Sequence, residues 1–224
     1  MKRSLQIKKL VVVSLISALA YLCMFVFRFK VGFLTFDIKD AILAIASLLY
    51  GPIWGVVSSG VVALLELITV SDTGFYGFIM NFISSATFTF TCGLIYRYRK
   101  NLTGAIVGVT TAAFSLTAVM LLANLFVTPY YMGVPRGEVA AMIPTLLLPF
   151  NAVKAMVNSG ATLLIYKPFT TALKRTGLLQ GKQDSNYRLN RQTVILILVS
   201  LVVIAISIYI LFSVLNGSFE WVRK

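Results

Sequence analysis

The chain contains no histidine, and it carries only two cysteines and seven acidic residues among its 224 positions. Without histidine, no Ser-His-Asp or Cys-His catalytic set can form, and most zinc and haem sites are excluded. Cys23 and Cys92 both lie inside apolar runs, so we expect no structural disulfide. No G-x-x-x-x-G-K-[ST] phosphate loop occurs, which excludes ATP hydrolysis by that route. These absences disfavour an enzyme, a resident cofactor and a metal site.

Apolar sequence is abundant instead. Hydrophobic residues make up 58% of the chain, and the mean hydropathy is +0.89. Because the apolar runs are continuous rather than alternating, they predict helices and not barrel strands, and hence an all-α, polytopic membrane protein. The net charge of +13 does not imply a nucleic-acid partner. The cationic residues cluster at the ends of apolar runs, as contact with membrane lipid requires.

Seven apolar segments are separated by polar or Gly-Pro breaks. We expect helices at 10–27, 41–50, 53–70, 78–96, 102–127, 146–167 and 193–215. Between them we expect an ordered loop at 28–40 that acts as a lid on the outer face, and an outer loop at 132–143. The chain then divides into a membrane domain (1–175), a basic cytoplasmic linker (176–192) and a further transmembrane helix with an outer tail (193–224).

The distribution of lysine and arginine predicts the orientation. With the N-terminus inside, the inner segments hold thirteen of these residues and the outer segments hold six. This bias favours a cell-membrane protein with a cytoplasmic N-terminus, seven crossings and an extracellular C-terminus.

Residues 146–167 form a membrane-length apolar run that contains Asn151, Lys154 and Asn158. Their spacing places all three on one face of a helix. A lysine within such a helix costs about 2.5–3.5 kcal/mol on insertion scales. Two interpretations stay open: a bound polar ligand offsets this cost, or the ammonium of Lys154 snorkels to the outer surface.

Polar and aromatic residues alternate at the predicted outer ends of the helices. The polar ones are Asp37, Asp40, Glu66, Asn81, Asn124, Asn151 and Lys154, and the aromatic ones are Phe33, Phe36, Phe75, Tyr76, Tyr130, Tyr131 and Phe150. Aromatic walls with a few amide and ammonium groups suit a flat heteroaromatic ligand, although such aromatics also form ordinary interfacial belts. Glu66 is either a pocket group or an interfacial carboxylate in contact with water.

Three segments carry a resemblance to a known family. Residues 34–40 (LTFDIKD), 50–55 (YGPIWG) and 149–154 (PFNAVK) resemble the riboflavin-binding S component of energy-coupling factor (ECF) vitamin transporters. The Pro-Phe-Asn-x-x-Lys element is the most specific of them. The resemblance implies a six-helix S-component bundle over 1–175 that captures riboflavin near its outer face, with a transmembrane coupling subunit and two ATPase subunits as partners.

The resemblance also implies roles for individual residues. Asn124, Asn151 and Lys154 match positions that hold the flavin, while Phe36 and Asp37 match the loop that covers it. Together with the polar residues Glu66 and Asn81, these are the candidate substrate-binding residues. Riboflavin would be a transported ligand and not a cofactor.

A stripe of small residues lies along the first predicted helix, where Ser14 and Ala18 are four positions apart. Such stripes let another helix approach closely, and packing within the same chain would explain this one equally well. The resemblance implies that the stripe contacts the coupling subunit, although serine replaces the family's alanine at position 14.

Two features depart from the family pattern. Glu66 lies where riboflavin binders carry lysine and asparagine, and the run at 193–215 extends beyond six helices. The sequence therefore leaves two further hypotheses: an S component for another vitamin or small heterocycle, and a structural membrane subunit that binds no ligand.

Overall fold

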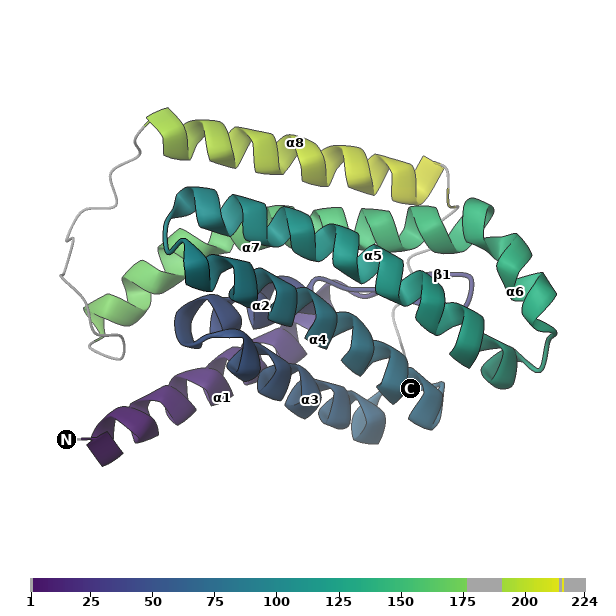
Figure 1. The fold of residues 1–224 in the computed structure, drawn as a ribbon, viewed down its shortest axis with the longest axis horizontal. Helices are drawn as coiled ribbons and strands as arrows, with labels where there is room; N and C mark the ends of the chain where they lie inside the picture. Colours follow the sequence, from purple (N-terminus) through teal and green to yellow (C-terminus); the bar gives the residue numbers. More distant parts are fainter. Residues whose placement is uncertain (1, 177–190, 214, 216–224) are drawn as a thin grey trace.

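The computed structural model describes residues 2–176, 191–213 and 215, and it is almost entirely helical (Figure 1). Its elements are α1 (Lys2–Val26), β1 (Phe29–Val31), β2 (Leu34–Phe36), α2 (Lys39–Tyr50), α3 (Pro52–Thr69), α4 (Gly74–Tyr98), α5 (Leu102–Met132), α6 (Arg136–Met142), η1 (Ile143–Leu147), α7 (Leu148–Arg175) and α8 (Arg191–Ser213). The predicted all-α bundle with an additional C-terminal helix is confirmed. Most of the predicted linker over 176–192, namely residues 177–190, and the end of the predicted outer tail, residues 216–224, lie outside the described residues.

Six helical stretches of the described chain are long and apolar enough to cross a bilayer: α1, α3, α4, α5, the continuous α6–α7 and α8. α2 is different, because its 12 residues extend only about 18 Å. That is shorter than the hydrocarbon core of about 30 Å. The expectation of a short second helix therefore holds, but α2 alone does not provide a seventh complete crossing.

The outer loop expected at 132–143 is largely helical instead. After a break at Gly133, where φ is +67°, α6 and the π-helical turn η1 lead directly into α7. In η1 the amide of Leu148 donates to the carbonyl of Ile143, five residues earlier. Pro149 follows at once and has no amide hydrogen to donate. π turns inside helices are frequent at functional sites, and this one immediately precedes the Pro-Phe-Asn-x-x-Lys element.

Two helices, α4 and α7, make most of the contacts within the bundle. α4 packs against α2, α3 and α5, and α7 packs against α2, α5 and α8. α1 packs against α2 and α3, so α1 and α8 lie on opposite sides of the molecule (Figure 1). Small residues permit the close approach of α2 and α4: a Cβ atom added at Gly93 would lie 1.9 Å from the hydroxyl oxygen of Ser47.

The loop between α1 and α2 folds into the antiparallel hairpin β1–β2. Phe29 pairs with Phe36, and Val31 pairs with Leu34, which leaves a two-residue turn. The first turn residue, Gly32, has a φ of +57°, a conformation that glycine adopts without steric cost. The hairpin is therefore a defined element within the loop that the sequence predicted to be ordered.

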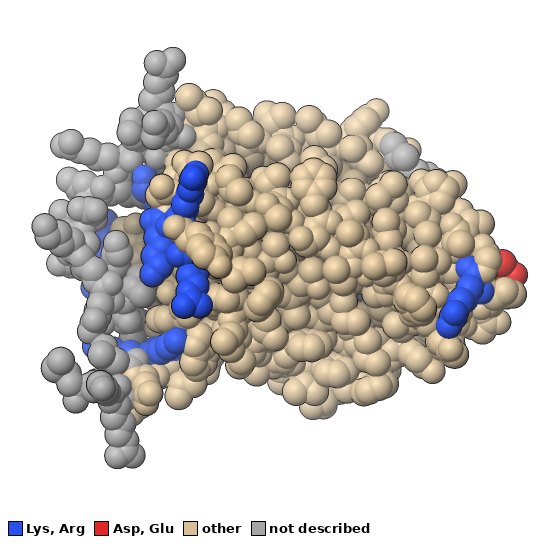
Figure 2. All heavy atoms as spheres, viewed as in Figure 1, with Lys and Arg blue, Asp and Glu red and all other residues tan. Residues whose placement is uncertain are grey.

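The surface has the charge distribution of a membrane protein. Figure 2 shows a broad central band without charged side chains on the visible face. Lysine and arginine gather at the end where α1 begins and where α4 and α5 meet. Arg97, Arg99 and Lys100 lie exposed at this end. The uncharged band matches the part of the helices that the hydrocarbon core would cover.

Candidate binding site

A cavity of about 300 Å³ opens between the hairpin, the ends of α3 and α5, and the beginnings of α4 and α7. This volume is at the lower end of the range for small-molecule sites. Five of the candidate residues line it: Glu66, Asn81, Asn124, Asn151 and Lys154. The cavity lies at the end of the bundle opposite the basic cluster, because it contacts the first turns of α4 whereas Arg97 and Arg99 lie at its last.

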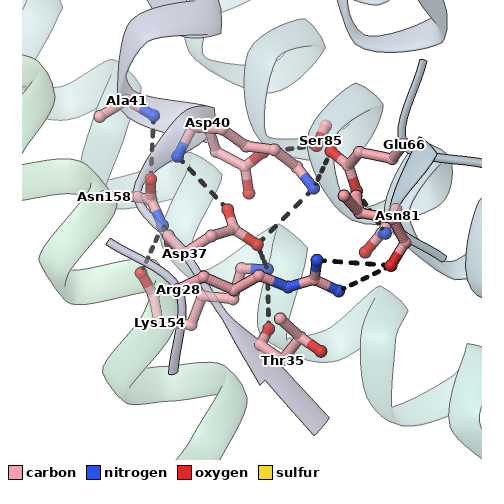
Figure 3. A network of polar contacts seen from close by, with 12 residues as sticks. Arg28, Thr35, Asp37, Asp40, Ala41, Glu66, Asn81, Ser85, Lys154 and Asn158 are labelled. Atoms are coloured by element: carbon pink, nitrogen blue, oxygen red, sulfur yellow. Dashed lines mark hydrogen bonds and ion pairs between the residues drawn. The ribbon is translucent and has the colours of Figure 1, made fainter. Parts of the chain in front are cut away.

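Lys154 is buried, with 4% of its surface exposed. Its ammonium lies 3.0 Å from the Asp37 Oδ2 atom and 3.5 Å from the backbone carbonyl of Thr35 (Figure 3). The snorkelling interpretation is therefore wrong. The idea that a guest molecule must offset the buried cation also needs correction, since Asp37 from the hairpin loop already neutralises it. An ammonium has three donors, and these two contacts leave one for a ligand.

A second buried cation lies beside the first. The ammonium of Lys39 is 2.5 Å from the Glu66 Oε1 atom and 3.6 Å from the Asp37 Oδ2 atom. Glu66 is 4% exposed and also accepts a hydrogen bond of 2.6 Å from Asn81. An interfacial carboxylate in contact with water is thus excluded. Lys39, which the sequence places in the loop expected on the outer face at 28–40, is 1% exposed.

The Asp37 carboxylate is shared between two ammonium groups. Burial by itself would raise the pKa of Asp37, but Lys154 and Lys39 outweigh that effect and hold the pKa well below its usual range. The carboxylate therefore stays ionised in the folded protein. Buried ion pairs are stabilising only when each charge keeps its partner, so the four charges of Asp37, Lys39, Glu66 and Lys154 form one interdependent group.

Hydrogen bonds fix the segment after the hairpin to α7 and α4 (Figure 3). The Asn158 side chain on α7 donates to the backbone carbonyl of Asp37 at 3.1 Å and accepts from the amide of Ala41 at 2.9 Å. Asp40 accepts a hydrogen bond from Ser85 on α4. At the other end of the hairpin, the Arg28 guanidinium lies 3.5 Å from the carbonyl of Val70, just after α3.

The two carboxamides next to Lys154 use only part of their hydrogen-bonding capacity inside the protein. Asn124 donates to the carbonyl of Met120 at 2.7 Å and accepts from Thr128 at 2.9 Å. Asn151 donates to the carbonyl of Leu147 at 2.7 Å. Each amide nitrogen carries two hydrogens and each oxygen has two lone pairs. Both side chains can therefore bind a ligand without giving up these contacts.

The predicted aromatic residues divide into two groups. Phe33, Tyr76, Tyr131 and Phe150 line the cavity, whereas Phe36, Phe75 and Tyr130 do not. Phe36 is instead buried below the hairpin, where its ring packs 6.4 Å from that of Phe150. Asp37 also lies outside the cavity lining. These two candidate residues are positioned to hold the lid and Lys154 in place and not to form the cavity wall.

The small residues predicted to form an interface lie on the outside of the bundle. Ser14 and Ala18 are both exposed on α1, and the residues beside them that pack into the chain are Val13, Ile16 and Ser17. Packing within the same chain therefore does not account for this stripe. The face remains accessible to a second helix or to lipid.

Comparison with known proteins agrees with this architecture. The family model of the ECF transporter substrate-specific component matches residues 8–166. The chain belongs to this family. The segment that matches runs from α1 into the second half of α7, and so contains every residue of the cavity. The S component thus comprises the six-helix bundle, and α8 lies beyond the matched segment.

Two curated relatives are riboflavin transporters by name. RibU of Staphylococcus aureus (strain TCH60) is 29% identical over 181 residues, which cover 76% of this S component and 94% of that protein. FmnP of Bacillus subtilis (strain 168) is 26% identical over 174 residues, which cover 72% and 92%. A solved structure described as the S component of a bacterial ECF transporter matches with a TM-score of 0.64 at 29% identity, covering 76% of this chain and 99% of that one.

Sequence reasoning did not identify Lys39 as part of the site. A signal was present, because Asp37, Lys39 and Asp40 place three ionisable residues within four positions at the start of an apolar helix. Charged residues buried in a membrane protein generally pair with one another. Their density could therefore have predicted a buried ionic group rather than an exposed loop.

Proposed function

We propose that this S component captures riboflavin at the outer face of the plasma membrane and delivers it for ATP-driven uptake by partner subunits. The single observation that carries the proposal is the open-mouthed cavity that is lined by Lys154, Asn124 and Asn151 together with aromatic side chains. An isoalloxazine ring offers carbonyl oxygens and ring nitrogens along its edge and two apolar faces. Aromatic walls suit such faces.

Polar contacts would supply one part of the binding free energy. A hydrogen bond to a charged group contributes about 1.5–3 kcal/mol, and a neutral one about 0.5–1.5 kcal/mol. One bond from Lys154 and one from each of Asn124 and Asn151 would then supply about 2.5–6 kcal/mol. Burial of the ring against Phe33, Tyr76 and Phe150 adds an apolar contribution.

Glu66 favours a second candidate, a different vitamin or heterocycle with a cationic or hydroxyl-rich part. Glu66 lines the cavity, and each of its oxygens already has a partner: Oε1 contacts Lys39 and Oε2 accepts from Asn81. Because that contact neutralises its charge, Glu66 also suits the hydroxyl groups of a ribityl chain. We therefore keep riboflavin as the first candidate.

The partners follow from the family. We expect a transmembrane coupling subunit that contacts α1 at Ser14 and Ala18, and two ATPase subunits. The basic end of the bundle would face the cytoplasm, which places the N-terminus inside and the cavity outside. After seven segments the C-terminus would then be extracellular.

A calorimetric titration of the purified chain against riboflavin, thiamine and biotin, without ATP, tests the proposal. We expect one riboflavin per chain and no heat from the other two vitamins. Binding of another vitamin in place of riboflavin would support the second candidate. Absence of binding to any vitamin, with a folded protein, would leave the structural subunit as the better account.

A further inference from the structure

α8 lies outside the part of the chain that the family shares. The family match ends at residue 166, whereas α8 begins at Arg191. The solved S component is covered over 99% of its length by only 76% of this chain. About a quarter of this chain therefore has no counterpart in that structure, and α8 requires an explanation of its own.

α8 is firmly packed on α7 along one face. Ser200, Ser207 and Leu211 are 2%, 0% and 1% exposed, and their spacing of seven and four positions defines one side of the helix. On α7 this side meets Gly160, where an added Cβ atom would lie 3.0 Å from the Ile204 side chain and 3.2 Å from the carbonyl oxygen of Ser200. Small residues at such crossings permit backbone contact within a membrane.

The C-terminal end of α8 lies beside the N-terminal part of α7 and reaches the hairpin. The Phe212 ring packs edge-on against the ring of Phe29 on β1, with centroids 6.2 Å apart and planes at 76°. Leu211 and Leu215 belong to the same buried cluster as Val31 and Phe36 of the hairpin. The hairpin is thus packed between α7 and the end of α8.

The two faces of the hairpin have different roles. Side chains alternate across a strand, and the paired residues Lys30 and Thr35 both line the cavity. The next pair, Phe29 and Phe36, packs in the opposite direction, toward the cluster that contains the end of α8. Contacts on the Phe29 face of the hairpin therefore affect how easily the hairpin can move away from the cavity.

We propose that α8 is a strap that holds the β1–β2 hairpin over the cavity and slows the entry and release of the substrate. The strap acts through Phe212, which contacts Phe29, and through Leu211 and Leu215, which share a buried cluster with the hairpin. None of these three residues lines the cavity. It works with the ionic contact between Asp37 and Lys154, which anchors the far end of the same segment. In its kinetic part this inference rests on the proposed function, because it needs a ligand whose release can be measured.

The test compares two aromatic truncations on the same helix. Phe212→Ala removes the contact with Phe29, while Tyr209→Ala removes a ring that is 69% exposed and serves as the matched control. Hydrogen exchange of the amides at 29–36 is measured in ligand-free protein, and riboflavin release is measured by chase with excess unlabelled ligand. We expect Phe212→Ala to accelerate both about tenfold, which corresponds to 1.4 kcal/mol, and Tyr209→Ala to change neither.

A second variant acts at a distance from the hairpin. Gly160→Leu places a bulky side chain where α8 crosses α7, so it should loosen the strap without touching the lid or the cavity. We expect the same acceleration at 29–36, while the amides of α4 keep their protection because the bundle remains folded.

The outcomes separate the two proposals. If wild-type protein binds no riboflavin, the proposed substrate fails, and the exchange at 29–36 still decides whether α8 holds the hairpin. If Phe212→Ala and Gly160→Leu leave the exchange unchanged, or if Tyr209→Ala accelerates it equally, the strap is refuted. Faster exchange without faster release also refutes its control over the substrate.

Discussion

Replacing Asp37 with asparagine tests the ionic group on which the site depends. Asp37→Asn keeps the size of the side chain, but it replaces one acceptor oxygen with a donor NH2 group and removes the negative charge between Lys154 and Lys39. Lys154 then loses its carboxylate partner and keeps neutral acceptors such as the carbonyl of Thr35 at 3.5 Å, whereas Lys39 keeps Glu66 at 2.5 Å. We expect the uncompensated charge of Lys154 to destabilise the folded protein.

The distance between Asp37 and Lys154 gives the expected size of this destabilisation. At an effective dielectric constant of 20, unit charges 3.0 Å apart attract by about 5.5 kcal/mol. The cost of desolvating both ions offsets much of this attraction, and removing one partner of a buried pair typically costs about 3–5 kcal/mol. Lys154→Met should cost less than Asp37→Asn, because Asp37 would still have Lys39 at 3.6 Å.

Thermal unfolding in detergent, followed by circular dichroism, measures the effect. Asp72→Asn is the matched control, since Asp72 pairs with Lys30 at 3.2 Å with 54% of its side chain exposed, and exposed pairs contribute about 0–1 kcal/mol. The double variant Asp37→Asn/Lys154→Met should lose less stability than the sum of the single changes. An Asp37→Asn protein as stable as Asp72→Asn would refute the reasoning.

Three further predictions concern pH, binding and coupling. Because the folded pKa of Asp37 is lowered, its stabilisation is complete above the unfolded pKa of about 3.9. It is lost as the pH falls below that value, so the unfolding temperature should drop below about pH 4, and by less in Asp37→Asn. Asn124→Leu should weaken riboflavin binding about tenfold, or 1.4 kcal/mol, in calorimetry, with little change in unfolding temperature. A normal affinity would exclude that contact. Ala18→Trp should leave binding intact but abolish uptake in cells that contain the partner subunits, and undiminished uptake at equal expression would remove the α1 interface.

The sequence predicted most of the architecture because its signals are strong and local. Long apolar runs have one solution in a membrane, so the spans were found, although their ends were wrong by up to eight residues at the start of α1 and the end of α7. The loop at 132–143 was misjudged because Gly133 and Pro135 indicate a break, whereas the residues that follow them continue as α6. The β1–β2 hairpin gave a weaker signal, since its strands are only three residues long.

The site was predicted as a set of residues but not as a set of contacts. Lys154 and Asn124 were identified by their type and their place along helices, and both line the cavity. What the sequence could not provide is the pairing of residues 117 positions apart, such as Asp37 with Lys154. Tertiary packing decides which buried charge meets which, and so it also decides that Phe36 supports the lid and does not line the cavity.

The most direct test of the account is the affinity of purified wild-type protein and of Lys154→Met for riboflavin, measured by calorimetry in the absence of ATP. Lys167→Met, on the exposed part of α7, is the control for loss of a lysine from the same helix. We predict tight binding by wild type and by the control, and a loss of about tenfold to a hundredfold in Lys154→Met, from one charged hydrogen bond of about 1.5–3 kcal/mol. Equal affinities in all three proteins, or no binding by the folded wild type, would contradict the central claim.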